Sequence, residues 1–98
     1  MDEPWFCYML QCSDGSFYVG IANDLEERLK EHSWGKDSEY TAKRRPVTLV
    51  WHQEFASKQD ARKREVELKG WSRRKKLELI RKGAALSETS PGTLSGEA

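Results

Sequence analysis

The chain has no apolar run that approaches the length of a membrane span. Its first residues, Met1-Asp2-Glu3-Pro4, lack the basic and apolar segments of a secretory signal peptide. These absences predict a cytoplasmic protein that does not bind membranes. The low hydropathy does not indicate disorder, because four tryptophans, three tyrosines and three phenylalanines supply bulky side chains for a core.

Cysteine is scarce, with two residues in the chain. Cys7 and Cys12 lie at an odd separation in one predicted strand, so their side chains point to opposite faces and a mutual disulfide is excluded there. Two cysteines without a further Cys or His cluster also make a poor zinc site. We therefore expect both to be small buried hydrophobic residues.

The hydrophobic pattern predicts an α+β fold. We expect a small three-stranded antiparallel sheet flanked by helices, in the order β-β-α-β-α-α. The expected strands are 5–12, 16–21 and a third with Val47, Leu49, Trp51 and Phe55 on one apolar set. The expected helices run from Asn23 or Asp24 to Glu31 or His32, from Ser57 to about Lys69, and onward from Ser72.

The 98 residues are enough for one domain with a single modest core. We place this domain at residues 1–82. The stretch 33–45 is expected to be irregular, and residues 83–98, rich in Ser, Thr, Gly, Pro and Glu, are expected to form a disordered tail.

Charge is distributed unevenly along the chain. Residues 1–40 carry three basic and nine acidic side chains, whereas residues 41–82 carry fourteen and five. The densest basic runs, Lys43-Arg44-Arg45 and Arg73-Arg74-Lys75-Lys76, suit contacts to phosphates, although such runs also occur as ordinary solvated helix faces.

Tyr8 and Tyr18 occupy the first two predicted strands, and the turn between them decides whether they share a face. A two-residue turn at Asp14-Gly15 would place them on opposite faces. A three-residue loop, with Gly15 in the left-handed region, would pair Tyr18 with Leu10 and Tyr8 with Gly20, so that both phenols share one face. In that register Gly20 would leave an open space beside Tyr8.

Two helices carry ionisable groups on faces that should be apolar. Arg28 and His32 continue the stripe of Leu25 and Leu29, and Glu65 stands on an inward face with Ala61 and Leu68. Such groups suit phosphate binding, proton transfer and metal binding, respectively. Structural alternatives are an ion pair of Arg28 with Glu31 or Glu27, a satisfied helix-end histidine, and an ion pair of Glu65 with Lys69 or Arg62.

Several motifs, in their order along the chain, resemble those of the small stand-alone GIY-YIG proteins of bacteria. The resemblance covers about residues 5–82. It rests on Phe6-Cys7-Tyr8, Tyr18-Val19-Gly20, Asn23-Asp24-Leu25, Arg28-Leu29, His32, Tyr40-Thr41, Arg45-Pro46-Val47, Leu49-Val50, Glu65 and Leu68-Lys69.

The resemblance implies a metal-dependent DNA endonuclease related to the incision subunit of excision repair, with a function in repair or recombination. Tyr8 and Tyr18 would position or activate water, and Arg28 would hold the scissile phosphate. Glu65 would bind a divalent cation, Mg²⁺ or alternatively Mn²⁺, and His32 would act in proton transfer. The residues expected to contact nucleic acid are Gly20, Lys43, Arg44, Arg45, Lys69, Arg73, Arg74 and Lys75.

Two other functions remain open on the sequence alone. One is a nucleic-acid-binding module of the same fold that does not cleave, with Trp34 or Trp71 as a stacking surface. The other is a protein-interaction domain whose basic runs meet an acidic partner. The sequence leaves open RNA as a substrate, a protein partner that supplies specificity, and the oligomeric state.

Overall fold

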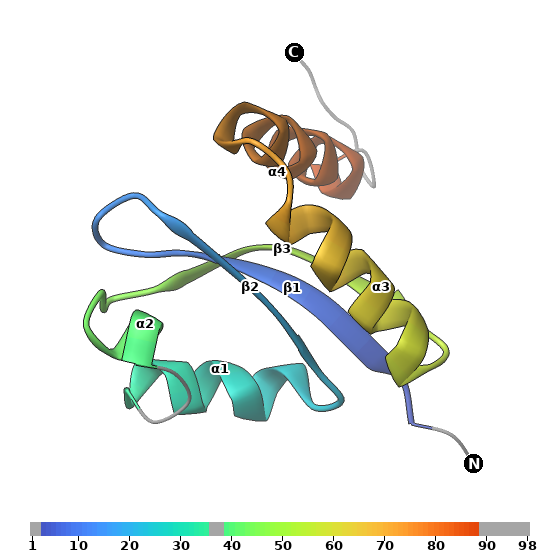
Figure 1. Cartoon of the computed structure of the whole chain (residues 1–98), viewed down its shortest axis with the longest axis horizontal. Helices are drawn as coiled ribbons and strands as arrows, with labels where there is room; N and C mark the ends of the chain where they lie inside the picture. Colours follow the sequence, from blue (N-terminus) through green and yellow to red (C-terminus); the bar gives the residue numbers. More distant parts are fainter. Residues whose placement is uncertain (1–2, 36–38, 89–98) are drawn as a thin grey trace.

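A three-stranded antiparallel sheet forms the centre of the protein (Figure 1). The structure is a computed structural model that describes residues 3–35 and 39–88. The strands are β1 (Trp5–Gln11), β2 (Phe17–Ala22) and β3 (Thr48–Phe55), in the order β2-β1-β3. The α+β prediction is confirmed.

The helices cover both faces of this sheet. They are α1 (Leu25–Ser33), α2 (Glu39–Ala42), α3 (Lys58–Lys69) and α4 (Arg73–Glu88). Figure 1 shows α1 and α2 on one side of the sheet and α3 with α4 on the other. Within the described ranges, no helix has the length and apolar character needed to cross a membrane.

The predicted helix starts are those seen in the structure. Asp24 caps α1 by accepting a hydrogen bond from the backbone N–H of Glu27, and Ser57 caps α3 by accepting one from Asp60. These side chains satisfy backbone donors that have no partner inside the helix. Gly70 ends α3, as the sequence predicts.

Strand β1 is covered on both faces, which explains why both of its alternating sets are apolar. Cys7 and Met9 belong to a core under α3 and α4, together with Val19, Trp51 and Leu68. Tyr8 and Leu10 belong to a second core, against which α1 packs Leu25 and Leu29. Both cysteines are buried and free.

The prediction of a single apolar set on β3 is wrong. Met9 of β1 faces Trp51, but the next residue, Leu10, faces Leu49, so Val50 is an extra residue at a β-bulge. The bulge changes the parity of the strand. Leu49 therefore packs in the Tyr8 core, whereas Trp51 packs in the Cys7 core.

Two further expectations differ from the structure. The stretch predicted as irregular contains the single helical turn α2, which is too short to show a hydrophobic period. Helix α4 continues past Gly83 to Glu88, six residues beyond the predicted end of the folded domain. The residues after Gly83 begin with Ala84-Ala85-Leu86, which have high helix propensity. The rest of the predicted tail, 89–98, lies outside the described residues.

Leu68 anchors α3 in the core, and its substitution tests that packing. The side chain is completely buried, so Leu68→Ala is expected to lower the free energy of unfolding by about 2–5 kcal/mol. Val66 lies on the same helix and is 61% exposed, so Val66→Ala serves as the control with a small effect. Urea unfolding followed by circular dichroism measures both. Equal losses for the two variants would contradict this packing.

Candidate active site

The β1–β2 turn sets the register that brings the two tyrosines together. Cys12 donates its backbone N–H to Ser16 at 2.8 Å, and Gly15 has a φ of +88°. The loop therefore has three residues, with the glycine in the left-handed region. Leu10 pairs with Tyr18 and Tyr8 with Gly20, which confirms the register in which both phenols lie on one face.

Tyr8, Tyr18 and His32 form one cluster on this face. The ring centroids of the two tyrosines are 6.4 Å apart, and the ring of His32 lies 5.7 Å from Tyr8 and 5.2 Å from Tyr18. The hydroxyl of Tyr8 and Nε2 of His32 are hydrogen-bonded at 2.8 Å. The structure thus brings together three of the five residues predicted to be catalytic.

Thr41 completes a chain of buried hydrogen bonds through His32. Its hydroxyl is 2.8 Å from Nδ1 of His32, and Tyr8, His32 and Thr41 are all fully buried. A neutral imidazole donates through one nitrogen and accepts through the other, while each hydroxyl can do either, so both tautomers satisfy the chain. Thr41 belongs to a motif that carries the family resemblance, but no role was predicted for it.

Gly20 is required by the close approach of the Tyr8 ring. A Cβ atom at this position would lie 2.7 Å from the hydroxyl oxygen of Tyr8 and 2.9 Å from its Cζ. The space predicted beside Tyr8 is therefore filled by the phenol itself. Because Gly20 is buried, it does not lie on the surface as a nucleic-acid contact, contrary to the prediction.

Tyr18 connects the buried cluster to the surface. Its side chain is half-buried, and its ring centroid lies 6.0 Å from that of Tyr40, which is 37% exposed. The guanidinium carbon of Arg44 lies 3.9 Å from the centroid of the Tyr40 ring. A substrate can therefore approach Tyr18 from the surface, whereas Tyr8 is shielded.

Arg28 lies at the edge of the sheet formed by β2. Its Nη1 donates to the backbone oxygen of Ile21 at 3.1 Å, and its Nε is 3.1 Å from a carboxylate oxygen of Glu31. The predicted structural ion pair is thus present. The Arg28 side chain remains 33% exposed, which leaves the guanidinium accessible from solvent.

Glu65 lies on the other side of the sheet. It is carried by α3, which packs on β1 and β2 over the Cys7 face, and its side chain is 14% exposed. Burial and then the negative charge of Glu65 raise the pKa of the Cys7 thiol to about 12. The inward placement is confirmed, but so is the ion pair with Lys69, at 3.0 Å.

The structure therefore divides the predicted catalytic set between two faces. Tyr8, Tyr18 and His32 cluster on the face covered by α1 and α2, whereas Glu65 belongs to α3, which covers the other face. Within the described part of the chain, no group of three or more His, Cys, Asp or Glu side chains could hold a metal ion. Glu65 would have to bind a metal with help from water and substrate oxygens.

The residues predicted to bind nucleic acid have different surroundings. Arg45 donates to the backbone oxygens of Ala42 and Ser33, so it fastens α2 to the end of α1. Lys75 lies 4.9 Å from the ring centroid of Trp71. Arg44 and Arg73 both reach the β1–β2 turn.

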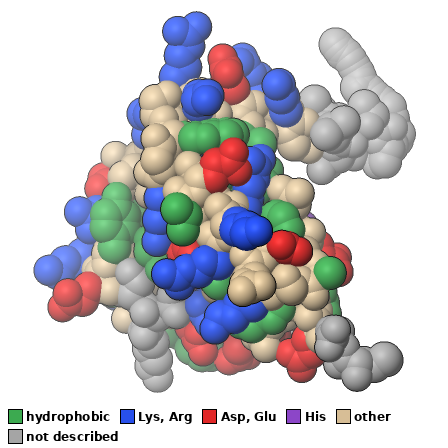
Figure 2. Space-filling view, turned by 45° about the vertical axis from the view of Figure 1, so that its right-hand side comes forward, with side chains coloured by type: hydrophobic (Ala, Val, Ile, Leu, Met, Phe, Trp, Pro, Cys, Tyr) green, Lys and Arg blue, Asp and Glu red, His purple; other side chains and the backbone are tan. Residues whose placement is uncertain are grey.

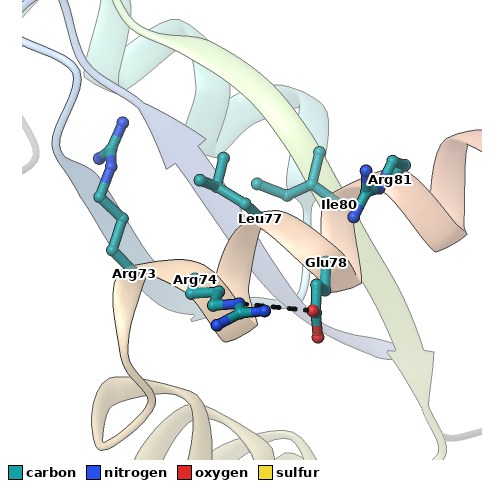
Figure 3. Close-up of a pocket in the computed structure, with 6 residues that line it drawn as sticks. All are labelled: Arg73, Arg74, Leu77, Glu78, Ile80 and Arg81. Atoms are coloured by element: carbon teal, nitrogen blue, oxygen red, sulfur yellow. Dashed lines mark ion pairs between the residues drawn. The ribbon is translucent and has the colours of Figure 1, made fainter.

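Figure 2 shows basic side chains spread over the middle and upper parts of the molecule, with a row of acidic ones along the lower margin, where α1 lies in Figure 1. An open groove runs along the N-terminal half of α4 (Figure 3). Its lining residues are Arg73, Arg74, Leu77, Glu78, Ile80 and Arg81. Arg74 pairs loosely with Glu78 at 3.9 Å, and Arg73 extends away from the other side chains.

Comparison with known proteins identifies the family. The family model of the GIY-YIG catalytic domain matches residues 4–78. The chain belongs to the GIY-YIG family. The domain is therefore of the nuclease type, and nucleic acid is the class of substrate that it implies.

The relatives of this GIY-YIG chain match it over nearly their whole length. It is 47% identical to a UPF0213 protein of Staphylococcus saprophyticus over 81 residues, which cover 83% of this chain and 99% of the relative. The solution structure of the UPF0213 protein BH0048 from Bacillus halodurans is 36% identical, with a TM-score of 0.56 over 95% of this chain and 99% of that one. The solution structure of EF2693 from E. faecalis is also 36% identical, with a TM-score of 0.57 over 84% and 90%.

Gly20→Ala tests the close packing against Tyr8. The added methyl group must displace the phenol, so we expect a loss of about 1–3 kcal/mol in unfolding free energy and a broken bond to His32. Tyr8→Phe removes one of the two clashing atoms. It should therefore lower the free energy of unfolding by less in the Gly20→Ala background than in the wild type.

The matched control is Gly70→Ala, because a Cβ atom there would meet nothing closer than 3.6 Å. Urea unfolding of the single and double variants measures the coupling. Additive effects of Gly20→Ala and Tyr8→Phe would contradict the contact.

Proposed function

We propose that this protein is a metal-dependent endonuclease that hydrolyses phosphodiester bonds in DNA, with a function in repair or recombination. The observation that carries the proposal is the buried hydrogen bond between Tyr8 and His32, with Tyr18 packed against both rings at the surface. A purely structural core would not require two hydroxyl groups and an imidazole in one completely buried chain.

Tyr18 and Arg28 are the groups that would meet the substrate. Arg28 offers a planar, permanently charged fork that binds phosphate oxygens, and the phosphate would replace Glu31 as its partner. Tyr18 would orient the attacking water through its hydroxyl. An ordinary phenol has a pKa of about 10, so orientation contributes more than proton removal at neutral pH.

Tyr8, His32 and Thr41 would act as positioning residues. Their hydrogen bonds fix the imidazole, and the imidazole supports one side of the Tyr18 ring. A ring held in this way loses little freedom when substrate binds, which favours a productive geometry. His32 would also be able to receive a proton from Tyr8 through Nε2.

Glu65 is the residue that would hold a metal ion, Mg²⁺ or Mn²⁺. Magnesium is commonly bound by one or two carboxylates together with water and substrate phosphates, so a single inward carboxylate suits it. When bound, the ion would neutralise charge that develops on the phosphate oxygens. Glu65 would have to exchange Lys69 for the metal and face a phosphate held at the β2 edge.

One observation favours a second function. Glu65 is already paired with Lys69 and lies across the sheet from Tyr8, which suits a nucleic-acid-binding module that does not cleave. Such a module would need the basic surface and the exposed aromatic rings but no metal. Such a surface would bind RNA as well as DNA.

A cleavage assay separates these functions. Wild-type protein is incubated with Mg²⁺ or Mn²⁺ and a panel of duplex, single-stranded, flap and branched DNAs. Glu65→Ala and Arg28→Ala are expected to reduce the cleavage rate by about a hundredfold or more. Glu65→Ala should leave metal-free DNA binding measurable, because binding to the basic surface does not use this carboxylate.

The controls for this assay lie on the same helices. Glu67→Ala changes a carboxylate of α3 that is 53% exposed, and Lys30→Ala changes an exposed cation of α1. Both variants should cleave like the wild type. Cleavage that survives Glu65→Ala unchanged would reject the metal-binding role, and binding without any cleavage would favour the module.

A further inference from the structure

Two arginines from distant parts of the chain each contact the β1–β2 turn. Arg44 follows α2, and its Nε is 3.0 Å from a carboxylate oxygen of Asp14. Arg73 begins α4, and its Nη1 donates to the backbone oxygen of Gly15. Because Asp14 and Gly15 are neighbours in the chain, the two guanidinium groups are held at the same tip of the hairpin.

Both guanidinium groups are fixed in place by an aromatic ring as well as by the turn. Arg44 lies 3.9 Å from the ring centroid of Tyr40 and donates to its backbone oxygen at 3.0 Å. Arg73 lies 4.9 Å from the ring centroid of Phe17. The backbone around Arg44 is also tied to the turn, because Ser13 donates its N–H to the Arg44 carbonyl at 2.9 Å.

The arginines retain hydrogen-bonding capacity for a ligand. A guanidinium has five N–H donors. Hydrogen bonds within the described residues use two donors of Arg44 and one of Arg73. A fork already held in place loses less conformational freedom on binding than a freely moving side chain does.

Asp14 holds a negative charge among these donors. Its side chain is 49% exposed and also accepts hydrogen bonds from the backbone N–H and the hydroxyl of Ser16, at 3.0 and 2.6 Å. Ser16 first and Arg44 second keep the pKa of Asp14 below its ordinary value, so the carboxylate is charged at neutral pH. An incoming anion would compete with it for Arg44.

A series of ring contacts joins the turn to the candidate active site. Arg44 stacks on Tyr40, and Tyr40 lies beside Tyr18. From these contacts we infer that Arg44 and Arg73 at the β1–β2 turn form a second phosphate-binding site. The ligand is a backbone phosphodiester of the bound nucleic acid, away from the bond that is cut, and it displaces Asp14 from Arg44. This inference rests on the proposed function.

The position of the site favours a nucleic-acid strand over an acidic peptide. A strand that enters at Tyr18 has phosphates at regular intervals, and those that follow can reach Arg44 beyond Tyr40 and then Arg73 at the tip of the hairpin. Each guanidinium is held over an aromatic ring, and its planar fork suits bidentate contacts to phosphate oxygens. The phosphate must displace the charged carboxylate of Asp14 from Arg44, so Asp14 lowers the affinity of the site for the strand.

Metal-free binding of fluorescein-labelled DNA, followed by anisotropy in EDTA at several salt concentrations, tests the site. The probe is the DNA of the cleavage panel that the wild type binds most tightly. Arg44→Gln and Arg73→Gln remove one charge each and keep a donor. Each should weaken binding several-fold and reduce the slope of log K against log salt by about 0.9 on duplex DNA or about 0.7 on a single strand.

Asp14→Asn is the decisive variant, because it should tighten binding. The substituted amide still accepts from Ser16 but no longer neutralises Arg44, so we expect an increase of about threefold to tenfold in affinity. Arg44→Gln in the Asp14→Asn background should remove this gain, since both changes act on one pair.

The controls lie at the opposite end of the sheet. Lys58 lies 5.2 Å from the ring centroid of Trp5, and Glu54 faces Phe6. Lys58→Gln and Glu54→Gln change charge by the same amounts, so they measure the general effect of net charge on binding. Thermal unfolding of every variant shows that the fold is retained.

The outcomes separate this site from the proposed function. The site is supported if Asp14→Asn raises the affinity for DNA more than Glu54→Gln does, and if adding Arg44→Gln to Asp14→Asn removes that increase. Equal changes in affinity for Asp14→Asn and Glu54→Gln overturn the site while leaving the nuclease proposal intact. Wild-type protein that binds no DNA of the panel overturns both, and binding of a poly-glutamate peptide with the same dependence on Asp14 points instead to a protein partner.

Discussion

The hydrogen bond between Tyr8 and His32 is the interaction on which the arrangement of the candidate active site depends. It requires a strand register that places Tyr8 under α1, a neighbouring residue without a side chain at Gly20, and a partner for the second imidazole nitrogen at Thr41. Each requirement comes from a different element of the fold. The rings of Tyr18 and then Tyr40 pack outward from this buried pair toward solvent.

The two faces of the sheet carry different kinds of side chain. The face under α3 and α4 carries an apolar core that includes Met9, Trp51 and Leu68. The face under α1 and α2 carries the hydroxyl and imidazole groups. The bulge at Val50 changes the parity of β3, so that Leu49 packs in the Tyr8 core and Trp51 in the Cys7 core. Strand β2 forms one edge of the sheet, and Arg28 is hydrogen-bonded to it.

Local patterns predicted much of this arrangement because local chemistry determines it. The sequence limited the hairpin to a two-residue turn or a three-residue loop at Gly15, and the structure has the loop, which pairs Tyr8 with Gly20. Asp24 and Ser57 cap their helices in the way that their sequence positions indicate. The family resemblance added the group of residues to which Tyr8, Tyr18 and His32 belong.

The remaining features depend on contacts between distant segments. The bulge at Val50 is a feature of the pairing with β1 and leaves no local mark in the sequence of β3. Thr41 lies in a single helical turn, so nothing near it in the chain indicates that it meets His32. Likewise, the inward position of Glu65 follows from helical periodicity, but the face of the sheet on which α3 packs does not.

Nuclear Overhauser contacts among the aromatic side chains in solution test the Tyr8–His32 arrangement most directly. We expect contacts between the rings of Tyr8 and Tyr18, and a slowly exchanging hydroxyl proton of Tyr8 with a contact to the His32 ring. Contacts from Tyr18 to Met9, with none to Tyr8, would place the phenols on opposite faces and contradict this arrangement.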